Sequence, residues 1–445
     1  MASEGRRERI PELDGLRVLM IAAVSWFHIW QQSWLTPESP LSSAAQQWVY
    51  RNLGIEPVWN WLIQTGYIWV DGTILLSVFL LYLPWARAAR TGEPGPDRRD
   101  FWFRRARRVL PAYYFILLCH LFFIAIPWRL YGNNGSWMVQ DIFTHLTFTF
   151  TRFPETCLAT PLGGAAWTLA ILVQGYALFP FLALGVRKHP LVVPGCMLAL
   201  CFGYRAWCLW DHSDYSMMVN QLINFLDVYV IGILCATGFD ALRARREAQP
   251  LPARKRYLLE AGATVLFLGF LYGLIRMLQV QFHVPYGELQ GWQMVYRPVF
   301  ALCFGGLILT APFALLPLRK LLGNPVTRFL AGISMNYYLI HQTVAVHLKT
   351  RLQIPWTEGY IEAKVWELNA WLMEGRRVTH YPNELGAEYR DWQVQYSWLC
   401  VIVSLGMAIC VTYLVEKPGA RLMDRMRKRL AQRRALKDGI TSSSD

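Results

Sequence analysis

Long apolar segments recur along this 445-residue chain and alternate with shorter polar stretches. Most are about 18 to 22 residues long, enough for a helix to span the roughly 30 Å hydrocarbon core of a bilayer. Core helices of a soluble protein would carry polar residues at helical spacing, and most of these segments do not. The pattern therefore predicts an all-α, polytopic integral membrane helix bundle. Ten spans are expected, at about residues 16–35, 66–85, 109–129, 165–185, 191–208, 219–238, 258–279, 293–313, 328–349 and 396–416.

The basic residues are concentrated in every second connection and in the C-terminal tail, whereas connections on the opposite side, such as 209–218 and 281–292, contain almost no Lys or Arg. Cytoplasmic loops of membrane proteins carry an excess of Lys and Arg. The distribution therefore predicts that both termini are cytoplasmic and that the number of spans is even. The basic stretches are residues 87–108, 187–188, 243–256, 319–320 and 417–429.

The composition supports a protein of the cell membrane and argues against two other classes of function. Hydrophobic residues make up 54% of the chain and charged residues only 17%, below the quarter that is typical of soluble domains. The net charge of +14 could indicate nucleic acid as a partner, but the bases lie on short membrane-proximal loops and no binding module surrounds them. The nine cysteines form no CxxC or Cys/His pattern, so we expect no metal site.

Three stretches outside the predicted spans have compositions that predict distinct structures. Residues 36–65 mix Trp and Leu with polar residues, which favours an interfacial helix. Residues 350–395 form a long, slightly acidic outer loop of the kind that often has a function. Residues 430–445 are expected to be disordered. We therefore divide the chain into a ten-span membrane domain, 1–422, and a basic, partly disordered cytoplasmic tail, 423–445.

Ionisable side chains inside spans are costly and are candidates for function. His28 follows Arg17 by 11 residues, which places it roughly 16 Å deeper along a helix and past the bilayer midplane. A neutral imidazole can take a proton from a hydroxyl group. Asp71, at the outer start of the second span, could orient such a base, and His341 lies at a similar depth in the ninth span. The alternatives are a hydrogen-bonded core histidine, interfacial solvation of Asp71 and a helix–helix hydrogen bond of His341.

A cluster of arginines precedes the third span. Topology and binding of lipid headgroups explain most such residues. The alternative is a clamp for a cytoplasmic phosphate, because guanidinium groups bind phosphate through two hydrogen bonds. The cluster contains Arg104, Arg105, Arg107 and Arg108.

Together these segments resemble the motifs of the membrane-bound acyltransferase-3 family, whose members O-acylate surface glycans and related acceptors. Arg17 and His28 stand at the spacing of the opening motif, and Arg105 and Arg108 match an Arg-x-x-Arg pair. The resemblance covers about residues 11–182 and 328–422. The segments are PELDGLRVLMIAAVSWFH, WVDGTILLSVFLL, FRRARRVLPAYY, WTLAILVQGYALFP, ISMNYYLIHQ and YLVEKPGARL.

The resemblance implies transfer of an acyl group across the membrane. Acyl-CoA, with acetyl or another short chain, would bind from the cytoplasm through Arg17, Arg105 and Arg108. His28 would act as general base, with Asp71 or another polar group orienting it, on a hydroxyl of an extracytoplasmic glycan or related acceptor. No permanently bound cofactor is implied. Residues that would contact the acceptor are Trp167, Gln174 and His341.

Two departures from the family pattern leave a second reading open. The family commonly carries paired glutamates where this chain has Leu172 and Val173, and Gly where it has Val78. Loss of two carboxylates removes groups that could position an acceptor or share a proton. The sequence therefore permits either an acyltransferase of a divergent branch or a non-catalytic transporter or sensor on the same scaffold.

Overall fold

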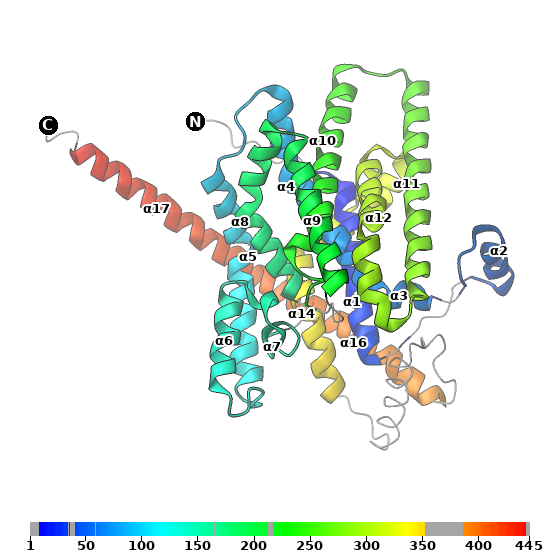
Figure 1. Cartoon of the computed structure of the whole chain (residues 1–445), viewed down its shortest axis with the longest axis horizontal. Helices are drawn as coiled ribbons and strands as arrows, with labels where there is room; N and C mark the ends of the chain where they lie inside the picture. Colours follow the sequence, from blue (N-terminus) through cyan, green and yellow to red (C-terminus); the bar gives the residue numbers. More distant parts are fainter. Residues whose placement is uncertain are drawn as a thin grey trace.

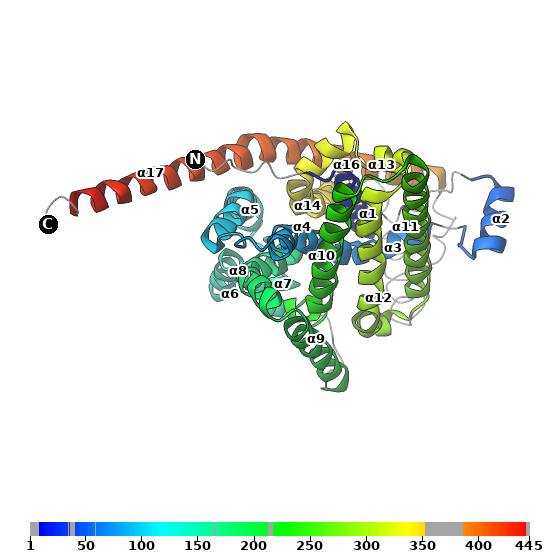
Figure 2. The ribbon, with the colours of Figure 1, turned by 90° about the horizontal axis from the view of Figure 1, so that it is seen from above.

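The structure is a computed structural model that describes residues 9–33, 35, 41–57, 59–163, 166–211, 217–351 and 386–441. Within these ranges the chain forms helices and no strand. Most of the long helices run side by side in one bundle (Figure 1, Figure 2). The predicted all-α fold is therefore confirmed. Most of the predicted outer loop 350–395 lies outside the described residues.

Nine helices or helical runs in the described part of the chain are long and apolar enough to cross a membrane. They coincide with nine of the ten predicted spans, so the chain is a multi-pass membrane protein. They are α1 (Pro11–Ser33), η1 with α4 (Gly66–Thr91), α5 with η2 (Arg98–Ala125), α8 (Trp167–Lys188), α9 (Val192–Asp211), η5 with α10 (Leu222–Ala248), α11 (Ala253–Phe282), α12 with η7 (Leu289–Phe313), and Arg390–Arg433 within α16, η9 and α17.

The tenth predicted span corresponds to α14 (Pro325–Arg351), which is less apolar than the other nine. Its 27 residues give a length of about 40 Å, sufficient for a membrane. Its polar side chains Ser334, Asn336 and His341 are at most 5% exposed, and α14 packs against α1 and α16 (Gly386–Val411). Polar residues of membrane helices face the bundle interior in this way. The tenth span therefore stays a prediction, supported by length and burial.

The centre of the bundle is formed by α4 (Trp69–Thr91), α10 (Leu226–Ala248) and α12 (Leu289–Thr310). Small residues allow these helices to approach closely. A Cβ atom at Gly232 would lie 2.9 Å from the side chain of Val78 and 3.2 Å from the carbonyl oxygen of Leu75. The missing side chain on α10 therefore accommodates Val78, one of the two departures from the family pattern.

The segments that charge predicts on one side of the membrane lie together at one end of the bundle. Arg319, in α13 (Leu316–Leu322), pairs with Glu12 at 2.8 Å, and Arg90 pairs with Asp240 at 2.6 Å. Figure 1 shows the α10–α11 connection and both described chain ends toward this end. The grouping agrees with the predicted alternation of the loops. That this end faces the cytoplasm remains the prediction of the charge distribution.

The opposite end carries shorter helices: α2 (Ser43–Leu53), α3 (Asn60–Gln64), α6 (Gly135–Leu146) and α7 (Pro154–Cys157). The helix expected within residues 36–65 is present as α2 and α3. In α2 no residue is buried, and Trp48 and Tyr50 are exposed. An interfacial position suits such a helix, and it stays a prediction.

The C-terminal tail differs from the expectation. α17 (Lys417–Thr441) is one continuous helix and includes residues 430–441, where disorder was expected, whereas 442–445 lie outside the described residues. The partly disordered tail stays a prediction. The segment is rich in Arg, Lys, Leu and Ala, which favour helix. It also continues directly from α16 through the π-helical turn η9 (Thr412–Glu416), so no new helix has to be nucleated. The domain boundary at residue 422 stays a prediction and falls within α17.

Candidate functional site: a basic cavity beside a histidine pair

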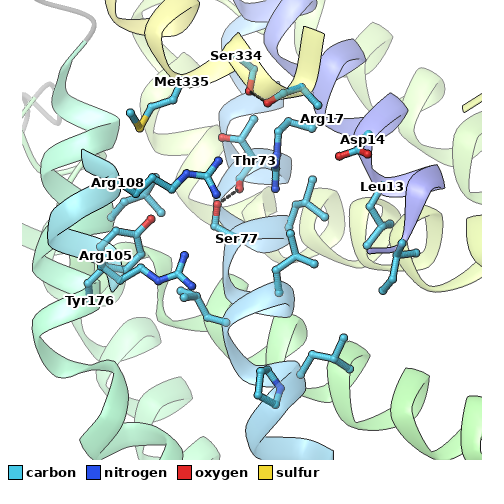
Figure 3. Close-up of a pocket in the computed structure, with 18 of the residues that line it drawn as sticks. Leu13, Asp14, Arg17, Thr73, Ser77, Arg105, Arg108, Tyr176, Ser334 and Met335 are labelled. Atoms are coloured by element: carbon cyan, nitrogen blue, oxygen red, sulfur yellow. Dashed lines mark hydrogen bonds between the residues drawn. The ribbon is translucent and has the colours of Figure 1, made fainter. Parts of the chain in front are cut away.

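A cavity of about 850 Å³ lies between α1, α4, α5 (Arg98–His120), α8 and α14. Its basic part is formed by segments that are far apart in the sequence, and Figure 3 shows several of these side chains pointing into one space. Two acidic residues, Asp14 and Glu93, also line it, and Asp14 pairs with Arg9 at 2.7 Å. The arginines that line it are Arg9, Arg17, Arg87, Arg105, Arg108 and Arg243.

The rest of the cavity is mainly apolar. Leucine side chains of α4, α8 and α14 form its walls, and hydroxyl groups of Thr73, Ser77, Thr168 and Tyr338 lie among them. Thr168 and Tyr176 are both lining residues and stand eight positions apart on α8, which corresponds to about 12 Å along the helix axis. The cavity therefore extends from a cationic end to a weakly polar end.

Three of the arginines are those that the sequence singled out. Arg105 lies over the rings of Phe101 and Tyr176, at 5.6 and 5.8 Å from the ring centroids. The side chains of Arg17 and Arg108 point into the cavity (Figure 3). In the described part of the chain they form no hydrogen bond or ion pair. Like charges that converge on one space repel each other, and a bound anion offsets that repulsion. The arrangement can therefore hold phosphate groups.

His28 and His341 form a hydrogen-bonded pair between α1 and α14, with Nδ1 of His28 at 2.7 Å from Nε2 of His341. Nδ1 of His341 lies 2.7 Å from the carbonyl oxygen of Tyr338, so it must donate. In two neutral rings Nε2 of His341 then accepts from Nδ1 of His28. Nε2 of His28 is left with a free lone pair, the state that a general base requires.

Tyr338 connects the cavity to the histidine pair. Its hydroxyl lies 2.7 Å from Oγ1 of Thr168, and its ring centroid is 5.5 Å from that of His341. Neither histidine is among the cavity-lining residues. The weakly polar end of the cavity therefore stops one aromatic side chain short of the pair. Tyr338 is part of the motif ISMNYYLIHQ, and the sequence predicts no role for it.

The structure places the carboxylate of Asp71 in another network. Its Oδ2 accepts from Nε of Arg297 at 3.0 Å, and both side chains are at most 1% exposed. The described polar contact of His28 is with His341. The expected orienting pair of Asp71 with His28 is therefore not formed, because Asp71 points into the interface of α4 with α12. His341 holds the position that we expected Asp71 to hold.

This second network joins four buried charged groups from four helices. Arg297 also donates to the carbonyl oxygens of Val219 and Asn224, at 3.0 and 3.2 Å. Arg205 donates to the side chain of Asn224 at 2.6 Å and lies 2.9 Å from Asp227. Neither Arg205 nor Arg297 is among the candidates that the sequence predicts. Their positions inside predicted spans were the available signal.

Two residues expected to bind the acceptor have contacts within the bundle, and their acceptor role stays a prediction. Gln174 donates to the carbonyl oxygen of Phe148 at 2.8 Å and to Oγ1 of Thr151 at 3.3 Å. Trp167 is half-buried and packs 6.4 Å from the ring of Phe225. Neither lines the cavity. Of the two positions where the family has glutamates, Leu172 lines the cavity and Val173 packs against a neighbouring apolar cluster.

The fold and this site define a class: a multi-pass membrane protein with a cation-lined cavity that leads toward a buried histidine pair. Comparison with protein families makes the class specific. The sequence profile of the acyltransferase-3 family, described as an acyltransferase domain, matches residues 10–416. The chain belongs to this family of acyltransferases.

A named relative shares part of the chain. The Bacillus subtilis (strain 168) protein "Putative peptidoglycan O-acetyltransferase YrhL" is 25% identical over 273 residues, which cover 58% of this chain and 37% of that protein. This chain therefore matches well under half of that relative's length. No solved structure matches the chain at a significant level.

Proposed function

We propose that this protein transfers an acyl group from acyl-CoA, bound at the basic end of the bundle, to a hydroxyl group of an acceptor on the other side of the membrane. The observation that carries the proposal is the cavity, which joins convergent arginines to the neighbourhood of the His28–His341 pair. A transporter or sensor on the same scaffold is the alternative, and the experiment below distinguishes the two.

Acyl-CoA has a charged part and an uncharged part that match the cationic and the weakly polar ends of the cavity. The phosphates of CoA would bind Arg17, Arg105 and Arg108, since charge-assisted hydrogen bonds to guanidinium groups are strong and can be bidentate. The long, uncharged pantetheine arm would lie along the leucine-lined walls. The thioester would then reach Tyr338 and Thr168, next to His341.

The chemistry follows from the hydrogen bonds of the histidine pair. Nε2 of His28 would remove the proton of the acceptor hydroxyl while its oxygen attacks the thioester carbonyl. The carbon–sulfur bond then breaks, and the CoA thiolate takes the proton from the imidazolium, leaving an ester and free CoA. His341 accepts a hydrogen bond from Nδ1 of His28, which fixes the tautomer and stabilises the imidazolium as an orienting group does.

The acceptor class comes from the family and the relative. The relative's name gives peptidoglycan as the acceptor and acetyl as the group transferred. We propose a cell-surface glycan hydroxyl and an acetyl or other short acyl group for this chain. The predicted topology, with the arginines inside and His28 past the midplane, gives the direction of transfer.

The test is acyl modification of surface glycans, measured by mass spectrometry in a strain that expresses either the parent chain or the His28→Ala variant. Removal of a general base lowers a rate by about 10²- to 10⁴-fold, so the acyl groups should disappear. The matched control is His283→Ala, since His283 is an exposed histidine that pairs with Glu56 and should behave as the parent.

Acylation that persists unchanged in the His28→Ala strain would overturn the proposal. The transport alternative predicts a different result. In that case a labelled solute would cross vesicles containing the purified protein without any dependence on acyl-CoA, and CoA release would not be detected.

A further inference from the structure

The C-terminal helix α17 leaves the bundle and extends beyond it (Figure 1, Figure 2). Its 25 residues correspond to a helix of about 37 Å. A helix in water that packs on nothing is only marginally stable, because most helical stability in proteins comes from burying one face. We therefore expect the part of α17 beyond the bundle to pack against another surface.

One face of α17 is already occupied by α5. Arg107 donates to both carboxylate oxygens of Asp424, at 2.6 and 2.7 Å. Arg427 forms an ion pair with Asp100 and lies 4.6 Å from the ring centroid of Phe103. These contacts lie on the first three turns of α5, which precede the predicted third span at residue 109. α17 is thereby held at the level where α5 enters the membrane.

A second face of α17 carries an apolar stripe that is more than half exposed in the described structure. Leu422, Met426 and Leu430 stand four residues apart, so they share one side of the helix. Their exposed fractions are 58%, 54% and 55%. Large apolar side chains exposed in a row mark an interaction site more often than single ones do.

A basic stripe runs directly beside the apolar one. Arg421, Arg425 and Arg429 each precede a member of the apolar stripe by one residue, and all three are exposed. From Arg421 to Arg433 the chain has six basic residues and one acidic residue, Asp424, which is paired with Arg107. A helix with parallel apolar and basic stripes fits the boundary between acyl chains and anionic headgroups, because long arginine side chains reach the phosphates while the apolar residues enter the membrane.

We propose that α17 lies on the membrane surface at the basic end of the bundle and binds anionic lipid headgroups through Arg421, Arg425 and Arg429, with Leu422, Met426 and Leu430 inserted below them. Charge complementarity and the direct continuation from the spanning helix α16 both favour a lipid surface. The helix emerges where the bilayer ends, so its apolar stripe meets lipid without any further partner. The inference does not depend on the proposed acyl transfer.

A mechanical consequence follows for the cavity. The ion pairs of Arg107 and Asp100 tie α17 to the helix that carries Arg105 and Arg108. A lipid-bound α17 would hold the start of α5 in place at the cavity mouth. Anionic lipid would thus order two elements, α17 and the first turns of α5.

The experiment measures amide hydrogen exchange by mass spectrometry on the full chain in nanodiscs sized for one copy. One set contains phosphatidylcholine only, and the other contains phosphatidylcholine with phosphatidylglycerol. Exchange of peptides within residues 421–433 should slow by about tenfold or more in the anionic discs, since each basic residue near such a surface adds favourable binding energy. Raising the salt concentration should reverse the effect.

Two triple variants separate the proposal from a general effect of charge. The Arg421→Gln, Arg425→Gln, Arg429→Gln variant should lose the slowing in anionic discs. The control variant Arg254→Gln, Lys255→Gln, Arg256→Gln removes three exposed charges from the start of α11 and should keep it.

Equal exchange of 421–433 in the two lipid mixtures would overturn the proposal, as would a first triple variant that behaves like the parent. Slowing that appears only in larger discs with two copies, and independently of phosphatidylglycerol, would also overturn it. In that case the apolar stripe would be covered by a second copy of this chain.

Discussion

Two pairs of arginines show how the same side chain takes different roles in one membrane protein. Arg205 and Arg297 are at most 3% exposed and are bonded to Asp227 and Asp71 and to backbone carbonyl groups. Arg17 and Arg108 face a cavity and pair with no described residue. A buried arginine bonded to a carboxylate and to backbone carbonyl groups is committed to the helix interface, whereas an arginine beside a cavity that forms no hydrogen bond or ion pair in the described part of the chain is available for an anionic ligand. Depth in the membrane alone does not distinguish these roles.

The largest effect is expected from breaking the buried pair. Arg297→Gln would leave the carboxylate of Asp71 buried without its counter-charge, and loss of one partner of such a pair typically costs about 3–5 kcal/mol. Thermal unfolding in detergent measures the loss. The double variant Asp71→Asn, Arg297→Gln should recover part of it, because no unpaired charge remains. A single variant as stable as the parent would contradict the structural role of this pair.

Loss of a cavity arginine should weaken binding of acyl-CoA and leave the thermal stability of the protein unchanged. Arg108→Gln removes charge-assisted hydrogen bonds to phosphate, each worth about 1.5–3 kcal/mol, so the KM for acyl-CoA should rise roughly 10- to 100-fold. Arg108→Lys should recover only part, since lysine cannot bind phosphate through two hydrogen bonds. Steady-state kinetics together with thermal unfolding checks this prediction. A large fall in stability with an unchanged KM would place Arg108 with the structural arginines.

A smaller effect should follow when a carboxylate is added to the cavity wall. Leu172 lies one turn before Tyr176, whose ring contacts Arg105. Leu172→Glu would bring a carboxylate within reach of that guanidinium and compete with the donor phosphates. A partly solvated pair contributes at most about 1 kcal/mol, so the KM for acyl-CoA should rise about two- to fivefold. Leu172→Gln, of similar size and without charge, is the control and should stay near the parent.

The smallest effect is expected at the surface pair of Arg107 with Asp424, whose side chains are 40% and 37% exposed. Exposed ion pairs contribute about 0–1 kcal/mol, so Asp424→Asn should change the free energy of unfolding by less than about 1 kcal/mol. The measurement is the same thermal unfolding in detergent. If Asp424→Asn lowered the free energy of unfolding as much as Arg297→Gln, the exposure of an ion pair would not predict its contribution to stability.

The sequence predicted the helices of the bundle better than the contacts among polar residues. Nine spans and the grouping of the basic loops follow from local hydrophobicity and charge, which each segment carries by itself. The ends of helices were less predictable. The tail was expected to be disordered from its polarity, yet α17 is helical because α16 has already formed the preceding turns.

The candidate site was predicted in part. Arg17, Arg105 and Arg108 do line one cavity, and His28 and His341 do meet. Asp71 was assigned to His28 because both lie toward the same side of the membrane. Depth in the membrane does not determine which neighbouring helix a side chain faces. The rotation of α4 about its axis turns Asp71 toward Arg297. The same reasoning applies to Gln174, which holds the residues before α8.

What the sequence determined by itself is the class: an all-helical membrane protein with a basic end, an Arg–His pair on the first span and the motifs of an acyltransferase family. The tertiary structure decided which groups act together. His28 and His341 are 313 residues apart, and Asp71 and Arg297 are 226 apart. No local pattern encodes such pairs, because they depend on which faces of the helices are turned toward each other when the bundle packs.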